Sequence, residues 1–87
     1  MKKFKIYSAN YCDFCKRAVI LLLYKGAHFE VVDITKNGAA RDVLKQMLGS
    51  TTVPQIFYDD MPIGGCSDLL AMDESGELDD LITKGEK

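Results

Sequence analysis

The sequence predicts an α/β protein with a central four-stranded mixed sheet flanked by helices. A segment of strand periodicity, Lys3 to Ser8, is followed by a helical period and then by a second apolar strand, Phe29 to Ile34. Two further apolar runs, residues 55–58 and 61–64, are separated only by Asp59-Asp60, which is a hairpin pattern. The predicted element order is β-α-β-α-β-β-α with a short final helix.

The first strand and first helix are separated by a change of period. Polar and apolar side chains alternate in residues 3–8, as in a half-buried strand. Apolar residues then recur at helical spacing, and Lys25-Gly26 supplies a basic last turn and a glycine stop. A buried strand through Ala18 to Tyr24 is the alternative. Since no Gly or Pro interrupts residues 13–25, the length favours a helix.

The second strand should pair in parallel with the first, because a helix separates them and allows a right-handed crossover. Asn37-Gly38 then opens a second helix that ends at Gly49. Its apolar residues are expected to form one face of the helix, made of Ala40, Val43, Leu44, Met47 and Leu48.

The last third of the chain adds a hairpin and two helical segments. Gln55 to Tyr58 and Met61 to Gly64 are its strands, which make the sheet mixed. Ser67-Asp68 can cap a third helix that runs through Met72. A final amphipathic turn or two is predicted from Leu78, Leu81 and Ile82.

Length and charge exclude several classes of protein. With 87 residues the chain has room for one domain, residues 1–87. A net charge of −2 without a basic block argues against nucleic-acid binding. The longest apolar run is far short of the ~20 residues of a membrane helix. No apolar segment follows Lys2-Lys3, and three cysteines make a poor disulfide framework. We therefore expect a soluble, cytoplasmic monomer without a membrane partner.

Cys12 and Cys15 carry the clearest chemical signal. Cys12 falls where the first strand gives way to the first helix, so free N–H groups and the positive end of the helix dipole can stabilise a thiolate there. The thiolate is the form that attacks a disulfide. Cys15 lies on the same side of the helix, close enough to form a disulfide, and is predicted to be the resolving sulfur.

Two other interpretations of the cysteine pair are possible. The cysteines could be buried core residues, or they could be half of a zinc site that needs two further ligands. His28 and Cys66 are the remaining candidates for such ligands, and they lack zinc-ligand spacing. A Cys-x-x-Cys beside a βαβ pattern favours redox chemistry, so we predict no metal site.

Three separated segments resemble the glutaredoxin family in order and spacing: Cys12-Asp13-Phe14-Cys15-Lys16-Arg17-Ala18, Thr52-Val53-Pro54-Gln55-Ile56-Phe57 and Ile63-Gly64-Gly65-Cys66-Ser67-Asp68-Leu69. The likeness extends from the first strand to Leu78 and is strongest to the short bacterial dithiol members. It implies a thioredoxin fold, with glutathione as co-substrate and no tightly bound cofactor. Disulfide-bonded or glutathionylated proteins are the implied partners.

The resemblance also implies a glutathione site. Pro54 would be a cis proline that turns the Val53 backbone toward the bound peptide. The amides after Gly65 would hold one carboxylate, and Asp68 would approach the ammonium. Arg41 would contact the other carboxylate. The implied binding residues are Phe14, Arg41, Thr52, Val53, Pro54, Gly65, Cys66, Ser67 and Asp68.

Plainer interpretations of some of these residues stay open. Pro54 could be an ordinary proline at the start of a strand, and Gly64-Gly65 a bare turn. Arg41 could be a solvated surface residue, and Cys66 a packed, inert thiol.

The chain departs from the family pattern at three positions. Asp13 and Phe14 stand where the motif usually has Pro and Tyr, and Ala9 stands where relatives tend to have Lys. One cation for glutathione is thereby lost, and Lys16 is a candidate to replace it.

We therefore expect a glutathione-dependent thiol–disulfide oxidoreductase that uses Cys12 as nucleophile and Cys15 as resolving thiol. Two alternatives remain. The protein could be a redoxin reduced by thioredoxin reductase, or an electron carrier that holds an iron–sulfur cluster through the same motif.

Overall fold

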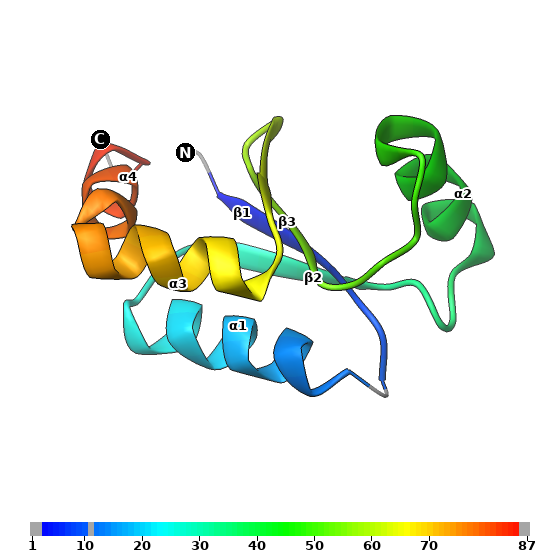
Figure 1. The fold of residues 1–87 in the computed structure, drawn as a ribbon, viewed down its shortest axis with the longest axis horizontal. Coiled ribbons are helices and arrows are strands. Elements are labelled where there is room, and N and C mark those ends of the chain that lie inside the picture. Colours follow the sequence, from blue (N-terminus) through cyan, green and yellow to red (C-terminus); the bar gives the residue numbers. More distant parts are fainter. Residues whose placement is uncertain (1–2, 11, 86–87) are drawn as a thin grey trace.

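Four strands form the sheet that carries the other elements in this computed structural model, which describes residues 3–10 and 12–85 (Figure 1). They are β1 (Phe4–Ser8), β2 (Phe29–Asp33), β3 (Gln55–Tyr58) and β4 (Met61–Gly64), in the order β2-β1-β3-β4. β1 pairs in parallel with β2 and antiparallel with β3, and β4 is antiparallel to β3. The predicted mixed sheet is confirmed.

Four helices accompany the sheet: α1 (Asp13–Tyr24), α2 (Gly38–Leu48), α3 (Cys66–Ser75) and α4 (Glu77–Gly85). α1 and α3 lie side by side on one face of the sheet (Figure 1). None of the helices in the described ranges is long and apolar enough to cross a membrane. The element order confirms the predicted α/β class.

The hydrophobic core lies on both faces of the sheet. On one face, Phe4, Ile6 and Ile56 of the strands pack against Leu22 of α1 and Leu69 of α3. A second cluster on the other face joins the strands to α2 and contains Tyr7, Phe57 and Leu44. β1 is therefore buried more completely than the half-buried strand that its alternation suggested, because Tyr7 is only 5% exposed.

The predicted apolar positions of α2 lie on one side of the helix, but only one of them is fully buried. Leu44 is fully buried, but Val43, Met47 and Leu48 are exposed. In Figure 1, α2 lies toward one end of the strands and not over the middle of the sheet. Its contact with the core cluster is therefore made mainly through Leu44, with the partly buried Ala40 beside it.

The C-terminal helices also differ from expectation. α3 begins at Cys66, with Gly65 and not Ser67 as its N-cap, because the Asp68 carboxylate reaches back to accept the Gly65 N–H at 2.9 Å. The helix continues past Met72 to Ser75 and ends at Gly76, which adopts φ 85°. The final helix is also longer than the predicted turn or two.

Lys25 joins the end of α1 to the last two helices. Its ammonium contacts the carboxylates of Asp73 at 2.8 Å and Asp79 at 3.0 Å. Hydrogen bonds to Asp73, and then to Asp79, raise the pKa of Lys25. Lys25, which the sequence suggested as a basic residue at the end of the helix, thus also holds α3 and α4 against α1.

Neighbouring leucines in α1 provide a test of this packing. Leu22 is fully buried, whereas Leu23 is 62% exposed. Leu22→Ala should lower the free energy of unfolding by about 2–5 kcal/mol, because it removes buried methyl groups and leaves a cavity. The matched control, Leu23→Ala, should change it by less than about 0.5 kcal/mol. Denaturant unfolding measures both, and equal losses would contradict this packing of α1.

Candidate active site

Cys12 is the N-cap of α1. Its backbone is extended, with φ −103°, and its sulfur accepts the N–H of Cys15 at 3.2 Å. The chain reaches this position through a turn after β1, in which the Cys12 N–H donates to the Ala9 carbonyl at 3.2 Å. Cys12 thus lies at the helix N-terminus, as the sequence predicted, and its sulfur takes the place of the oxygen that usually caps a helix there.

Cys15 lies one turn into α1 and is only 1% exposed. Burial raises the pKa of the Cys15 thiol above its ordinary value of 9.0, and a hydrogen bond to Cys12 raises it further. Hydrogen bonds from the Ser8 side chain and the Ala9 backbone oppose this effect. Cys15 is therefore a thiol at neutral pH. Cys12, Cys15 and Cys66 are all reduced in this structure.

A groove of about 320 Å³ lies beside Cys12. It is formed by the start of α1, the segment before β3 and the start of α3. The Cys12 thiol donates to the Val53 carbonyl at 3.7 Å, which ties the first of these segments to the second. The Val53–Pro54 bond is cis, as the resemblance implied. The lining residues are Phe14, Thr52, Val53, Pro54, Gln55, Gly65, Cys66 and Ser67.

The start of α3 presents backbone N–H groups at this groove. Cys66 and Ser67 occupy the first turn of the helix, where amides have no partner within the helix. Gly64 adopts φ 121°, and a Cβ at that position would collide with the Asp68 carboxylate. Glycine at position 64 thus leaves room for the Asp68 carboxylate to cap α3. The free amides at the N-terminus of α3 are suited to bind an anion.

Cys66 lines the groove but is only 6% exposed. Burial raises the pKa of its thiol, the nearby Cys12 raises it further, and the positive charge of Arg17 opposes this. Cys66 is thus protonated at neutral pH, which agrees with the predicted packed thiol.

Two of the nine predicted binding residues lie outside the groove lining. Asp68 caps α3 from just behind it, and Arg41 lies exposed on α2. The structure therefore brings together seven of the nine predicted binding residues around one groove: Phe14, Thr52, Val53, Pro54, Gly65, Cys66 and Ser67.

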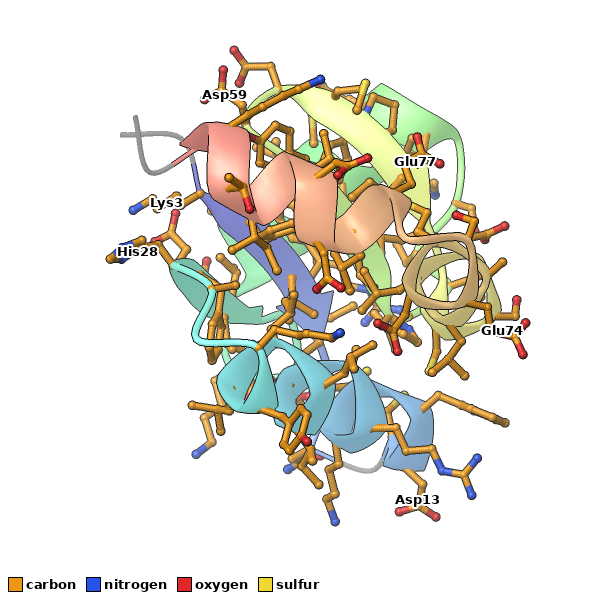
Figure 2. All side chains as sticks on the ribbon, turned by 90° about the vertical axis from the view of Figure 1, so that its left-hand side faces the viewer. Lys3, Asp13, His28, Asp59, Glu74 and Glu77 are labelled. Atoms are coloured by element: carbon orange, nitrogen blue, oxygen red, sulfur yellow. The ribbon has the colours of Figure 1, made fainter. Side chains whose placement is uncertain are left out.

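The charged neighbours of Cys12 point toward solvent. The Asp13 side chain is 92% exposed and lies 3.9 Å from the Lys16 ammonium. Figure 2 shows Asp13 at the start of α1, directed away from the body of the protein. Lys16 therefore forms an exposed ion pair with Asp13 and does not line the groove.

Sequence reasoning missed two residues at this site. Gln55 lines the groove directly after the proline, and its position next to Pro54 was the available signal. Ser8 ends β1 and lies beside Cys15. The sequence gives less reason to assign Ser8 to the site, because a serine at the end of a strand usually belongs to a turn.

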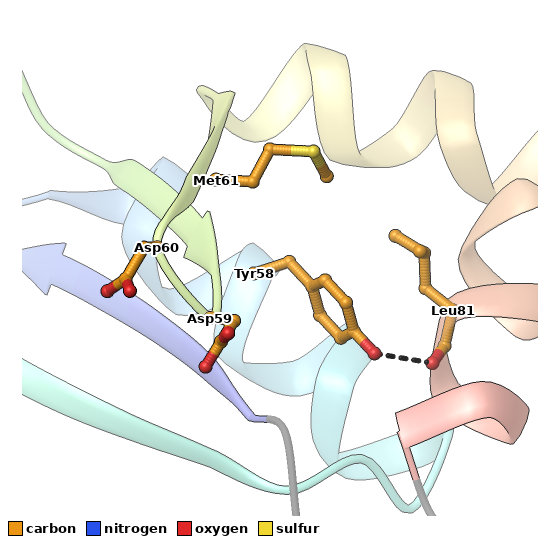
Figure 3. A pocket seen from close by; sticks show the side chains of 5 residues that line it. All are labelled: Tyr58, Asp59, Asp60, Met61 and Leu81. Atoms are coloured by element: carbon orange, nitrogen blue, oxygen red, sulfur yellow. Dashed lines mark hydrogen bonds between the residues drawn. The ribbon is translucent and has the colours of Figure 1, made fainter.

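A larger cavity, of about 540 Å³, lies at the hairpin turn, at the other end of β3. Figure 3 shows its lining residues Asp59, Asp60, Met61, Leu81 and Tyr58, whose hydroxyl donates to the Leu81 carbonyl at 3.0 Å. None of them carries a thiol, so redox chemistry belongs to the smaller groove. Nowhere in residues 3–10 and 12–85 do three His, Cys, Asp or Glu side chains gather as metal ligands.

Comparison with known proteins gives one family. Residues 4–63 match the glutaredoxin family model. Glutaredoxin 3 of Escherichia coli strain K12 is 45% identical over 82 residues, which cover 94% of this chain and 99% of the relative. A glutaredoxin of Pseudomonas aeruginosa is 40% identical over 78 residues, which cover 90% and 93%.

Solved structures of glutaredoxins have the same fold as this chain. The buckwheat glutaredoxin–glutathione complex superposes with a TM-score of 0.86 at 26% identity, over 98% of this chain and 80% of that chain. The solution structure of glutaredoxin from Brucella melitensis gives a TM-score of 0.78 at 38% identity, over 92% and 87%. The fold, the cysteine pair at the start of α1 and the near full-length identity together establish that this chain belongs to the glutaredoxin family of disulfide oxidoreductases.

Proposed function

We propose that the protein is a glutathione-dependent oxidoreductase that reduces protein–glutathione mixed disulfides and protein disulfides. The observation that carries this proposal is the position of Cys12, which caps α1 with its sulfur and contacts Val53 in the groove wall. A relative of the same fold has been solved as a complex with glutathione.

The groove matches the chemistry of glutathione, which has a peptide-like middle, two carboxylates and one ammonium. The Val53 backbone offers peptide groups for pairing with an extended ligand. The amides at the start of α3 can hold one carboxylate, with the Asp68 carboxylate nearby for the ammonium. The Phe14 ring covers one side of the groove.

The reaction begins at Cys12. Its thiolate attacks the glutathione sulfur of a mixed disulfide, the bond between glutathione and the substrate breaks, and the substrate thiolate leaves and takes up a proton. A Cys12–glutathione disulfide remains. A second glutathione thiolate then attacks the glutathione sulfur of this disulfide, which releases oxidised glutathione and restores Cys12.

Cys15 serves the reduction of protein disulfides. Because it is buried and protonated at neutral pH, it is the weaker initial nucleophile. The side chains of Cys15 and Cys12 are hydrogen-bonded to each other, so a disulfide can form between the two residues after Cys12 has been attached to a substrate.

Replacement of each cysteine by serine tests these roles. Cys12→Ser should abolish the reduction of a glutathionylated substrate, because the attacking sulfur is lost. Cys15→Ser should keep most of this activity and lose the reduction of protein disulfides. Turnover coupled to glutathione reductase measures the first reaction, and reduction of a disulfide-bonded protein measures the second.

Equal loss of mixed-disulfide reduction in both variants would contradict the single-thiol route. Wild-type turnover with thioredoxin reductase, and none with glutathione and glutathione reductase, would contradict glutathione dependence.

Arg41 is proposed as a cationic contact for the second carboxylate of glutathione, on the strength of the resemblance and of the lysine missing at Ala9. Arg41→Ala should raise the KM for glutathione several-fold, with little effect on kcat or thermal stability. Lys45→Ala removes a positive charge from the same helix and is the matched control. An unchanged KM in Arg41→Ala would leave Arg41 a solvated surface residue.

A further inference from the structure

A second cavity opens beside Cys15. Its volume is about 300 Å³, and it is lined by Ser8, Cys15, Lys16, Val19 and Ile20. It shares no lining residue with the groove at Cys12. Ser8 supplies the hydroxyl group of this otherwise largely apolar cavity, so Cys15 has its own polar neighbour away from the glutathione groove.

The backbone of Ser8 is held in place by the sheet. Ser8 is the last residue of β1 and pairs with Asp33 of β2. Its carbonyl accepts the Ile34 N–H at 2.9 Å. Ser8 is half-buried and lines the same cavity as Cys15, so it meets Cys15 from a strand end and not from a loop.

Cys15 needs a hydrogen-bond donor only in the steps of the reaction in which its sulfur is a thiolate. Burial and the neighbouring Cys12 both raise the pKa of the Cys15 thiol, whereas the hydrogen bond from the Ser8 side chain lowers it. A thiolate is required when Cys15 attacks, and it forms again when Cys15 leaves a disulfide. A hydrogen bond to a charged acceptor is stronger than one to its neutral form.

We propose that Ser8 is a positioning residue for the dithiol step, in which its hydroxyl donates a hydrogen bond to the Cys15 thiolate. The inference rests on the proposed function and assigns Ser8 to one branch of it. Removal of glutathione from Cys12 by a second glutathione does not use Cys15 and is independent of Ser8.

The step that Ser8 assists is balanced without a further reactant. Cys15 loses its proton to water, and its thiolate attacks the Cys12 sulfur of the Cys12–glutathione disulfide. The Cys12–Cys15 bond forms as the bond to glutathione breaks. Glutathione leaves as a thiolate and takes up a proton, so Cys15 is oxidised and glutathione is reduced.

Other groups around Cys15 are identifiable. Cys12 faces it from the same helix, and the Ala9 backbone hydrogen-bonds to it from the turn after β1. Lys16 lines the same cavity, but its ammonium lies 3.9 Å from Asp13. Ser8 is uncharged. Its replacement by alanine therefore removes a hydrogen-bond donor near Cys15 and leaves the charges around Cys15 unaltered.

The test follows ring closure directly. Reduced protein is mixed with excess oxidised glutathione and quenched with acid, and the glutathionylated and internally oxidised forms are separated by mass. Ser8→Ala should slow conversion of the first form to the second by roughly three- to tenfold near neutral pH. It should also move the rise of this rate to higher pH by about half a unit to one unit. Ser8→Thr, which keeps the hydroxyl, should restore both.

The same substitution in a Cys15→Ser background separates this role from a general effect on the groove. There, Ser8→Ala should leave glutathione-coupled turnover unchanged. Equal slowing in both backgrounds, or no change in ring closure, would overturn the proposal.

A measurement without glutathione keeps the inference separate from the proposed function. In a Cys12→Ser, Cys66→Ser background, Ser8→Ala should shift the pH dependence of Cys15 alkylation by iodoacetamide upward, and superimposed profiles would overturn the proposal. Failure of wild-type protein to form a glutathione adduct would instead contradict the proposed function alone.

Discussion

The contact between the Cys15 N–H and the Cys12 sulfur organises the site. It places the Cys12 sulfur at the point where α1 begins, so that one atom is both the cap of a helix and the proposed nucleophile. The first backbone N–H groups of a helix have no carbonyl partner within the helix. They can therefore donate hydrogen bonds to a sulfur at this position without help from any side chain. The other groups of the site are arranged around this sulfur.

Sheet topology brings the other groups to the same end of the molecule. β1 leads into the turn before Cys12, and β3 begins directly after Pro54. Because β1 and β3 are antiparallel, with Tyr7 opposite Gln55, the end of one strand lies beside the start of the other. β4 is antiparallel to β3 and delivers Gly65 to that same end. Three distant segments therefore meet without a long loop.

Much of this arrangement could be predicted from residue patterns. The change of period between residues 3–8 and 13–25 predicts β1 and α1, and the spacing of Cys12 and Cys15 on a helix predicts their shared side. The convergence of the Val53-Pro54 and Gly65-Cys66 segments could be expected only through the family resemblance, because periodicity does not specify how distant loops meet.

What could not be predicted depends on tertiary packing. The apolar positions of α2 look like a core face, yet the helix meets the core cluster mainly through Leu44 because of where it sits along the strands. The cap of α3 depends on the backbone of Gly64, which lets the Asp68 carboxylate approach. The role proposed for Ser8 depends on its neighbour Cys15 on another element, which the sequence around a strand-end serine does not reveal.

The burial of Cys66 has a consequence for oxidative damage. Peroxides react with thiolates far faster than with thiols, and oxidation beyond the sulfenic acid is hard to reverse. A thiol that is kept protonated and largely covered is a slow target, even though it lines the groove beside Cys12. The groove can thus include a soft, polarisable sulfur in its wall without offering an oxidant a second site of attack.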